Sequence, residues 1–361
     1  MKKAKQLVLE NGEVFQGIGF GAEGSSAGEI VFNTSMVGYQ EILSDSAYAG
    51  QIVVMTYPPM GQYGITDEDF ENRTPALAGM VVRECCETPS NFRFTKTLSE
   101  ELAEHGIPAI SEIDTRMLTR IIRDKGCMKA AIVDAEMPKE KALELIKKSK
   151  AEKRPVEKVS CKKRWFKRTQ RHKFDVVVID CGLKLSLVDI LNKMGCNVTV
   201  VPFSTSMEEV MQFRPDGVLI SSGPGDPREL PELIELVNGL KGKIPVAGIA
   251  LGHQIIALSY GALISKLKAG HHGGRPVKMV KDGRIITVEH NHNFTVDASA
   301  IKDSAVKVIC EDVVDRSVEG IACRRDMVLS TQFYPEGAPG PQEKLFFDTF
   351  VEWMKTNGQE K

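Results

Sequence analysis

The sequence predicts an α/β protein of two domains: the first is rich in β-strands and the second is built on a wound, mainly parallel sheet. Its 361 residues are enough for two hydrophobic cores. The first part has short apolar strands separated by glycine-containing turns, whereas strands and helices alternate from Phe174 onward. We therefore place the domains at residues 1–150 and 174–361, joined by a basic linker at 151–173.

Composition excludes several classes of protein. The formal net charge is −1, which favours neither nucleic acid nor a membrane surface as a partner. No apolar run approaches the ~18 residues of a membrane span, and the basic start of the chain is not followed by the apolar region of a signal peptide. The eight cysteines lack paired metal-ligand spacing, so we predict reduced thiols in a cytoplasmic protein.

Periodicity and turn residues predict the elements in chain order. In the first domain we expect strands at 6–10, 13–20 and 29–33, and helices at 97–105, 114–125 and 138–150. In the second we expect strands at 174–180, 197–203, 217–221 and 327–333, and helices at 183–194, 206–213, 231–240 and 342–355. Residues 261–279 and 284–289 suggest further strands with a loop that carries HHGG at 271–274.

A basic stretch, KKRWFKRTQRHK at 162–173, separates the two patterns. Basic residues interleaved with aromatic ones are found where proteins bind nucleic acid or phosphate. Because the rest of the chain is not basic, we interpret the stretch as a solvated linker or a docking surface.

The most informative motif is GIALGHQ at 248–254, which follows an apolar strand and begins a helical pattern. Gly-x-Ala-x-Gly in this position resembles a nucleophile elbow, a sharp turn that exposes one side chain and leaves a backbone N–H free to bind an oxyanion. The apex residue is Ala250, whose methyl group has no lone pair. The predicted geometry is that of a hydrolase, but the residue cannot perform the reaction.

Five further motifs accompany the elbow: FNTSMVGYQEIL at 32–43, EIDTR at 112–116, SGPGDP at 222–227, GHHGG at 270–274 and PEGAPGP at 335–341. Together they resemble the glutamine-hydrolysing small subunit of carbamoyl phosphate synthetase along essentially the whole chain. The first motif separates that family from other class I glutamine amidotransferases. The resemblance implies a small-subunit domain followed by an amidotransferase-like domain.

In that family a Cys at the elbow attacks the amide of glutamine, assisted by a His-x-Glu pair after the last strand. Ammonia then passes to a large subunit, which uses ATP and Mg in arginine and pyrimidine synthesis. The resemblance places the nucleophile at Ala250 and the base at Tyr334, and only the acid, Glu336, is retained. It implies no cofactor in this chain and a large subunit as partner.

The resemblance also implies a glutamine pocket with six matching positions, Gly223, Gly225, Leu251, Gln254, Asn291 and Phe294. Two positions depart from the family pattern. Ala47 stands where Ser is usual, and Asn293 stands where Gly is usual. Asn293 adds a side chain where the substrate approaches, at a position whose usual glycine suggests a backbone angle that other residues disfavour.

These changes predict that glutaminase activity is absent. A phenol titrates near ~10 and is a poor base at neutral pH, and loss of either member of a nucleophile–base pair costs on the order of 10⁴–10⁶ in rate. Rescue by Ser222 with His292 as base is disfavoured because neither residue is at the apex. An engineered Cys-to-Ala change would explain Ala250 but not the other departures, so we favour a natural loss.

Two functions stay open. The chain is either a non-catalytic partner of an ammonia-using large subunit or a free-standing regulatory module whose pocket binds glutamine or another small molecule. The intact first domain favours the partner role, because in the family that domain contacts the large subunit. We predict no metal site, since adjacent histidines such as His271 and His272 rarely converge on one ion and no acidic residue at ligand spacing accompanies them or His290 and His292.

Overall fold

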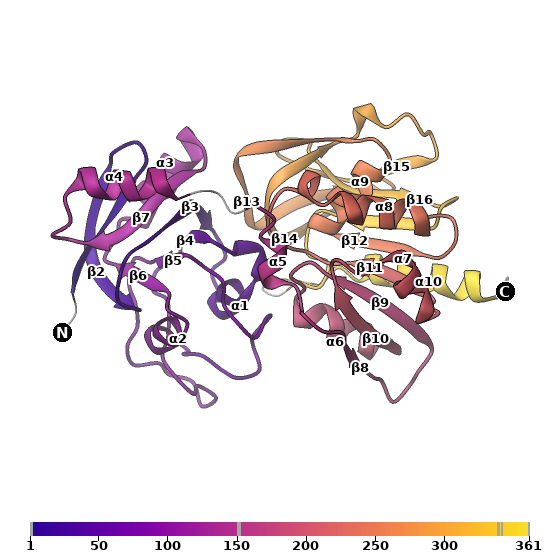
Figure 1. Cartoon of the computed structure of the whole chain (residues 1–361), viewed down its shortest axis with the longest axis horizontal. Helices are drawn as coiled ribbons and strands as arrows, with labels where there is room; N and C mark the ends of the chain where they lie inside the picture. Colours follow the sequence, from indigo (N-terminus) through magenta and orange to yellow (C-terminus); the bar gives the residue numbers. More distant parts are fainter. Residues whose placement is uncertain (1–2, 150–152, 338–339, 341, 360–361) are drawn as a thin grey trace. The chain divides into compact units, whose positions relative to one another are not determined.

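The computed structural model describes residues 3–149, 153–337, 340 and 342–359, which form two compact units (Figure 1). The first unit comprises Met1–Glu152 and Lys268–Gly273, and the second comprises Lys153–Leu267 and Gly274–Lys361. Each unit has hydrophobic cores of its own. No helix in the described part of the chain is long and apolar enough to cross a membrane.

The first unit is built on a closed barrel whose described strands follow the order β1-β2-β6-β5-β4-β3-β7. Neighbours are parallel from β3 through β4 and β5 to β6, and the other pairs are antiparallel. The strands are β1 (Ala4–Leu9), β2 (Val14–Gly21), β3 (Ser26–Asn33), β4 (Gln51–Met55), β5 (Gly79–Val81), β6 (Pro108–Ser111) and β7 (Met128–Asp134).

Side chains alternate between two cores along these strands. On β4, Ile52 and Val54 pack with α3, whereas Val53 and Met55 pack with α1 and α2. Local capping explains the helix boundaries: the Thr97 side chain forms a capping box at α2, and the Asp114 carboxylate accepts the Met117 N–H at 2.9 Å at the start of α3. The helices are α1 (Tyr39–Ser44), η1 (Ser46–Tyr48), α2 (Leu98–Glu104), α3 (Thr115–Lys125) and α4 (Lys139–Lys148).

The second unit contains a ten-stranded sheet in the order β14-β13-β15-β16-β17-β12-β11-β9-β10-β8. From β17 to β10 the strands are parallel, which confirms the predicted wound sheet for its centre, and antiparallel strands flank both sides. The strands are β8 (Trp165–Lys167), β9 (Phe174–Asp180), β10 (Cys196–Pro202), β11 (Gly217–Ile220), β12 (Val246–Ile249), β13 (Leu263–Met279), β14 (Ile285–Asp297), β15 (Val306–Asp312), β16 (Val318–Cys323) and β17 (Val328–Thr331).

Helices cover both faces of the parallel centre, so its strands are buried on both sides. Val177 and Ile179 of β9 pack with α7, α8 and α9, whereas Val176 and Val178 pack with α6 and α10. The helices and short turns are α5 (Val156–Val159), α6 (Leu185–Lys193), α7 (Met207–Gln212), η2 (Pro227–Glu229), α8 (Pro231–Leu240), α9 (Leu251–Ser259), η3 (Ala298–Ala300) and α10 (Lys344–Gln359).

One local prediction is wrong. Residues 271–274 do not form a loop, because β13 continues through them without interruption, and β14 extends to Asp297 rather than ending near residue 289. Glycine has a low strand propensity, yet residues 270–274 adopt strand conformation within β13.

The segment that composition marks as a linker makes many contacts within the second unit. The Arg154 N–H donates to Glu229 at 3.1 Å, Val156 lies in a hydrophobic core, and the Cys161 N–H donates to the Asp180 carboxylate at 2.8 Å. Further along, β8 pairs antiparallel with β10 at the edge of the sheet.

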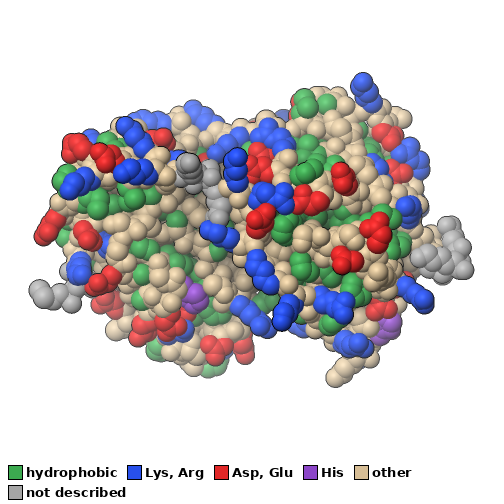
Figure 2. All heavy atoms as spheres, viewed as in Figure 1, with side chains coloured by type: hydrophobic (Ala, Val, Ile, Leu, Met, Phe, Trp, Pro, Cys, Tyr) green, Lys and Arg blue, Asp and Glu red, His purple; other side chains and the backbone are tan. Residues whose placement is uncertain are grey.

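Acidic neighbours offset part of this segment's positive charge. Lys167 pairs with Asp189, and His172 lies 3.2 Å from Asp175. Basic and acidic side chains are also interspersed on the face shown in Figure 2, in keeping with the balanced net charge of −1. The interpretation of residues 162–173 as a solvated linker or a docking surface stays a prediction.

Candidate functional site

The candidate site lies at the carboxyl ends of the parallel strands in the second unit. The strand order reverses between β9 and β11, because β10 lies on the far side of β9. In open α/β sheets, ligands bind beyond the carboxyl ends of strands at such a reversal. Asp180, Ser222, Ala250 and Tyr334 end or follow β9, β11, β12 and β17 at this edge.

Ala250 occupies the turn between β12 and α9 with φ 50° and ψ −104°. Its N–H donates to the Thr331 carbonyl at 2.8 Å, and its own carbonyl accepts the Gln254 N–H at 3.1 Å. A residue with a side chain in such a conformation carries strain of about 1–3 kcal/mol. This is the backbone of a nucleophile elbow, as the motif predicts, with a methyl group at its apex.

The two glycines that flank the apex are required by close packing. A Cβ on Gly248 would lie 2.6 Å from the Gly252 carbonyl oxygen, and a Cβ on Gly252 would lie 2.2 Å from the Ile220 carbonyl oxygen. Both contacts are with backbone atoms, which cannot swing away as a flexible side chain can. The glycines let α9 start directly against β11 and β12.

Tyr334, at the predicted base position, is 1% exposed and belongs to the same apolar cluster as Ala250. Its N–H donates to the Glu289 carbonyl at 2.9 Å. The Lys184 ammonium lies 4.2 Å from the centre of the Tyr334 ring, and Lys184 is also 1% exposed. Glu336, the predicted triad acid, is buried two residues further on.

Sequence reasoning missed Lys184. The only signal was its place, four residues after Asp180 at the carboxyl end of a parallel strand. Nothing local indicates a contact with Tyr334, which lies 150 positions away.

The predicted pocket glycines lie on the loop after β11. A Cβ on Gly223 would lie 2.1 Å from the Cys181 carbonyl oxygen, so this loop packs directly against the residues after β9. Gly225 has φ +98°, a conformation that side chains disfavour. Both positions therefore need glycine for backbone reasons, whatever ligand the site binds.

Three other predicted pocket residues are joined to one another inside the unit. The Gln254 side-chain amide donates to the Phe294 carbonyl and to Gln332 Oε1, both at 3.0 Å. Leu251 is 3% exposed and lies in a hydrophobic core. The Arg228 guanidinium lies 5.9 Å from the centre of the Phe294 ring.

Asn291 and Asn293 lie on β14, Asn291 buried and Asn293 half-buried. Asn293 does not have a positive φ, so the suggestion of a disfavoured backbone angle is wrong. As part of a continuous strand it adopts extended backbone that any residue tolerates. Ala47 lies in η1 of the first unit, where its N–H donates to the Asp45 carboxylate at 2.9 Å.

Comparison with known proteins identifies the family. Residues 7–132 match the carbamoyl-phosphate synthase small chain, CPSase domain, and residues 177–353 match glutamine amidotransferase class-I. The carbamoyl phosphate synthase small chain of Fusobacterium nucleatum is 44% identical over 98% of this chain and 99% of its own length. The chain belongs to the carbamoyl phosphate synthase small-chain family. The pyrimidine-specific small chain of Bacillus subtilis is 41% identical over 99% of this chain and 97% of its own length.

In this small-chain family member, the residues considered as substitute catalytic groups make structural contacts. The Ser222 carbonyl accepts a hydrogen bond from Ser221 Oγ at 2.8 Å. His292 Nδ1 is hydrogen-bonded to the Phe294 carbonyl at 2.8 Å. None of these contacts resembles a nucleophile held by a base.

His253, three residues after the apex, is fully buried and hydrogen-bonded to Ser330 Oγ at 2.9 Å. Burial lowers its pKa from 6.5 to about 3, so the imidazole is neutral in the folded chain at neutral pH. It therefore acts as a structural group of the elbow helix.

The pH dependence of stability should reveal His253. In the unfolded chain the His253 imidazole binds a proton below pH 6.5, whereas in the folded chain it stays neutral down to about pH 3. The free energy of unfolding therefore falls as the pH is lowered from 6.5 to 3. Between pH 7.5 and pH 5, the unfolding free energy of the unsubstituted chain should fall by about 2 kcal/mol more than that of the His253→Gln variant. Urea unfolding at both values measures it.

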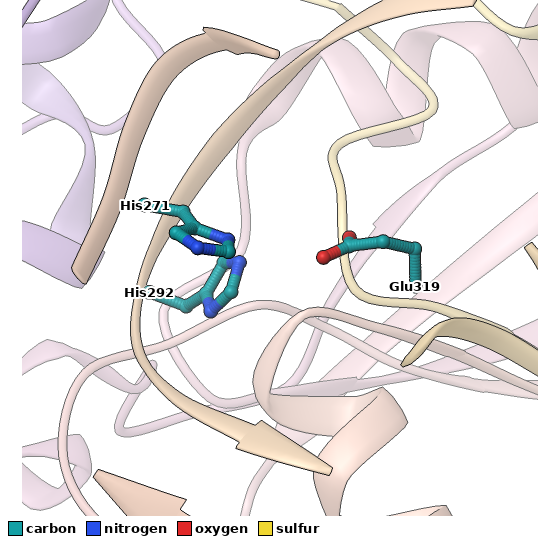
Figure 3. A group of neighbouring side chains, drawn as sticks. All are labelled: His271, His292 and Glu319. Carbon is teal, nitrogen blue, oxygen red and sulfur yellow. The ribbon is translucent and has the colours of Figure 1, made fainter. Parts of the chain in front are cut away.

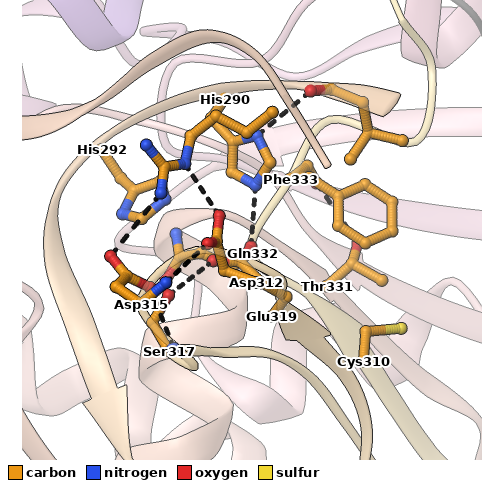
Figure 4. Close-up of polar contacts among 12 residues, drawn as sticks. His290, His292, Cys310, Asp312, Asp315, Ser317, Glu319, Thr331, Gln332 and Phe333 are labelled. Carbon is orange, nitrogen blue, oxygen red and sulfur yellow. Dashed lines mark hydrogen bonds and ion pairs between the residues drawn. The ribbon is translucent and has the colours of Figure 1, made fainter. Parts of the chain in front are cut away.

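A buried polar network links the antiparallel strands beside the site (Figure 4). His290 Nε2 lies 2.8 Å from Glu319 Oε2, and both residues are fully buried. Ser317 Oγ donates to the other Glu319 oxygen at 3.1 Å. Spacing along the sequence does not reveal this acidic residue, because Glu319 reaches His290 from a distant strand.

His292 on β14 and Glu319 on β16 offer ligand atoms within 4.8 Å of each other, and Figure 3 shows both side chains. The third residue labelled there, His271, belongs to the Lys268–Gly273 segment of the first unit. Zinc sites in proteins use three or four protein ligands. The predicted absence of a metal stays a prediction.

Proposed function

We propose that this chain is a small subunit without glutaminase activity that supports a carbamoyl phosphate synthase large subunit using free ammonia. The observation that carries the proposal is the strained elbow with Ala250 at its apex, where a thiolate is needed to attack an amide. The geometry is retained and the reactive atom is missing.

The position of the general base supports the same proposal. Tyr334 is buried against apolar side chains and under the Lys184 ammonium. A phenol is a poorer base than an imidazole at pH 7. Glu336 alone has no imidazole to orient, so the triad is reduced to one member.

The partner follows from the family. The relatives are named small chains, and the part of the sequence that matches the small-chain domain, residues 7–132, forms nearly all of the barrel unit. A large subunit would supply the ATP and Mg chemistry of arginine or pyrimidine synthesis, with no cofactor in this chain. A cytoplasmic location accords with this role and stays a prediction.

Copurification with the large subunit of the same organism tests the proposal. We expect a stable complex that forms carbamoyl phosphate from ammonium. With glutamine, its rate should be lower by a factor on the order of 10⁴ or more than the rate of a relative with Cys and His at the two positions. That relative, paired with its own large subunit, is the control. Synthesis from glutamine at a comparable rate would disprove the lack of glutaminase activity. Failure to copurify would favour the free-standing module that binds glutamine or another small molecule.

A further inference from the structure

The contact between Lys184 and Tyr334 joins the segments that follow two non-adjacent parallel strands, β9 and β17. Lys184 follows β9 and directly precedes α6, whereas Tyr334 follows β17. In the sheet, β9 and β17 are separated by β11 and β12. The contact therefore spans the width of β11 and β12, and Ala250, the residue at the end of β12, lies in the same apolar cluster as Tyr334.

Both partners are held firmly. The Tyr334 N–H donates to the Glu289 carbonyl at 2.9 Å, and the Gly337 N–H donates back to the Tyr334 carbonyl at 3.2 Å. Lys184 lies between Leu183, which is in the same apolar cluster as Tyr334, and the first turn of α6. The ring and the ammonium therefore meet in a geometry set by the backbone on both sides.

Burial strengthens this contact. A cation is attracted to the face of an aromatic ring within ~6 Å of its centre, and the attraction grows when water is excluded. Lys184 and Tyr334 are each 1% exposed, with the ammonium 4.2 Å from the ring centre. The Ala250 apex, in the same apolar cluster as the ring, is 2% exposed, although an elbow normally presents its apex to a substrate.

We propose that Lys184 is a positioning residue that holds the Tyr334 ring across the end of β12 and so keeps the elbow apex closed to small molecules. The closed state depends on the charge of the ammonium and on the face of the ring. Access to residue 250 is limited in this way whether or not a large subunit binds.

Alkylation at position 250 measures this access. In an Ala250→Cys chain, iodoacetamide labelling of that residue is followed by peptide-mapping mass spectrometry, which separates it from the eight natural cysteines. Adding Lys184→Met should accelerate labelling by at least tenfold. Loss of a nearby cation raises the pKa of a thiol and slows its alkylation, so an acceleration reports opening rather than a change in reactivity.

A second lysine–tyrosine pair in the same unit provides the matched control. The Lys241 ammonium lies 4.4 Å from the centre of the Tyr260 ring. Adding Lys241→Met to the Ala250→Cys chain should change the labelling rate by less than twofold. An equal acceleration by both substitutions, or none with Lys184→Met, would overturn the proposal.

Tyr334→Leu, again with Ala250→Cys, keeps the test decisive if Lys184→Met prevents folding. It removes the ring face and retains an apolar side chain, and labelling should accelerate to a similar extent. Where both variants fold, combining them should add little to either alone, because each breaks the same contact. A rate in Tyr334→Leu equal to that of the Ala250→Cys chain contradicts the proposal, as does full additivity of the two effects.

Discussion

A chain with Ala250→Cys and Tyr334→His together should form a glutamyl thioester on residue 250 when glutamine is supplied, whereas the unsubstituted chain forms none. The elbow already holds residue 250 at the strained apex, and Glu336 remains near the base position. Restoring a nucleophile–base pair recovers a factor on the order of 10⁴ or more in rate. Intact-protein mass spectrometry detects the adduct after rapid acid quenching.

Two variants isolate the reason for this result. Ala250→Cys alone supplies the thiol without a base, and Ala250→Cys with Tyr334→Phe keeps a ring at 334 that accepts no proton. Neither variant should form a detectable glutamyl thioester. If the Cys and His pair also forms no thioester, the two substitutions are not enough to restore the reaction, and further departures such as Asn293 must be reversed as well.

Gly252→Ala should destabilise the second unit by at least ~3 kcal/mol, at the upper end of the usual cost of overpacking. The new Cβ would lie 2.2 Å from the Ile220 carbonyl oxygen and 2.9 Å from the carbonyl carbon, so α9 would have to move away from β11. For a unit of about 200 residues, this corresponds to a fall in thermal midpoint of roughly 6 °C or more. Differential scanning calorimetry measures the midpoint.

Gly274→Ala is the matched control in the same unit. Its nearest neighbour would be Thr287 Cγ2 at 3.5 Å, an ordinary contact, and no left-handed backbone angle is involved. Its midpoint should stay within about 2 °C of the parent chain, in line with a surface-like change of under ~0.5 kcal/mol. Equal midpoints for the two variants would show that α9 moves away from β11 at little cost.

The elements of the parallel centre of the second unit were predictable because their signals are local. The glycine after α6, the proline that begins α8 and the apolar run of β9 lie within a few residues of the boundaries that they set. The elbow was predictable for the same reason, since five consecutive residues specify the turn.

Features that depend on distant pairing were not predictable from one sequence. The barrel closes through the pairing of β1 with β7, whose residues Lys5 and Asp134 are registered across more than a hundred positions. The Lys184–Tyr334 contact and the approach of Glu319 to His290 are of the same kind. Each joins residues whose spacing carries no periodic signal.

The contacts of residues 153–167 with the rest of the second unit determine where the chain can be cut to give a separate fragment. Pro155 packs against Gly225 on the loop after β11, where a Cβ on Gly225 would lie 2.8 Å from the proline ring. The carboxylate of Asp180 accepts the Cys161 N–H through one oxygen and the Gly182 and Leu183 N–H groups through the other. A cut before Phe174 would remove an edge strand and expose this carboxylate and loop, whereas a cut before Lys153 would preserve them. For this reason, we expect an amidotransferase-like fragment that folds on its own to begin at Lys153 rather than at Phe174.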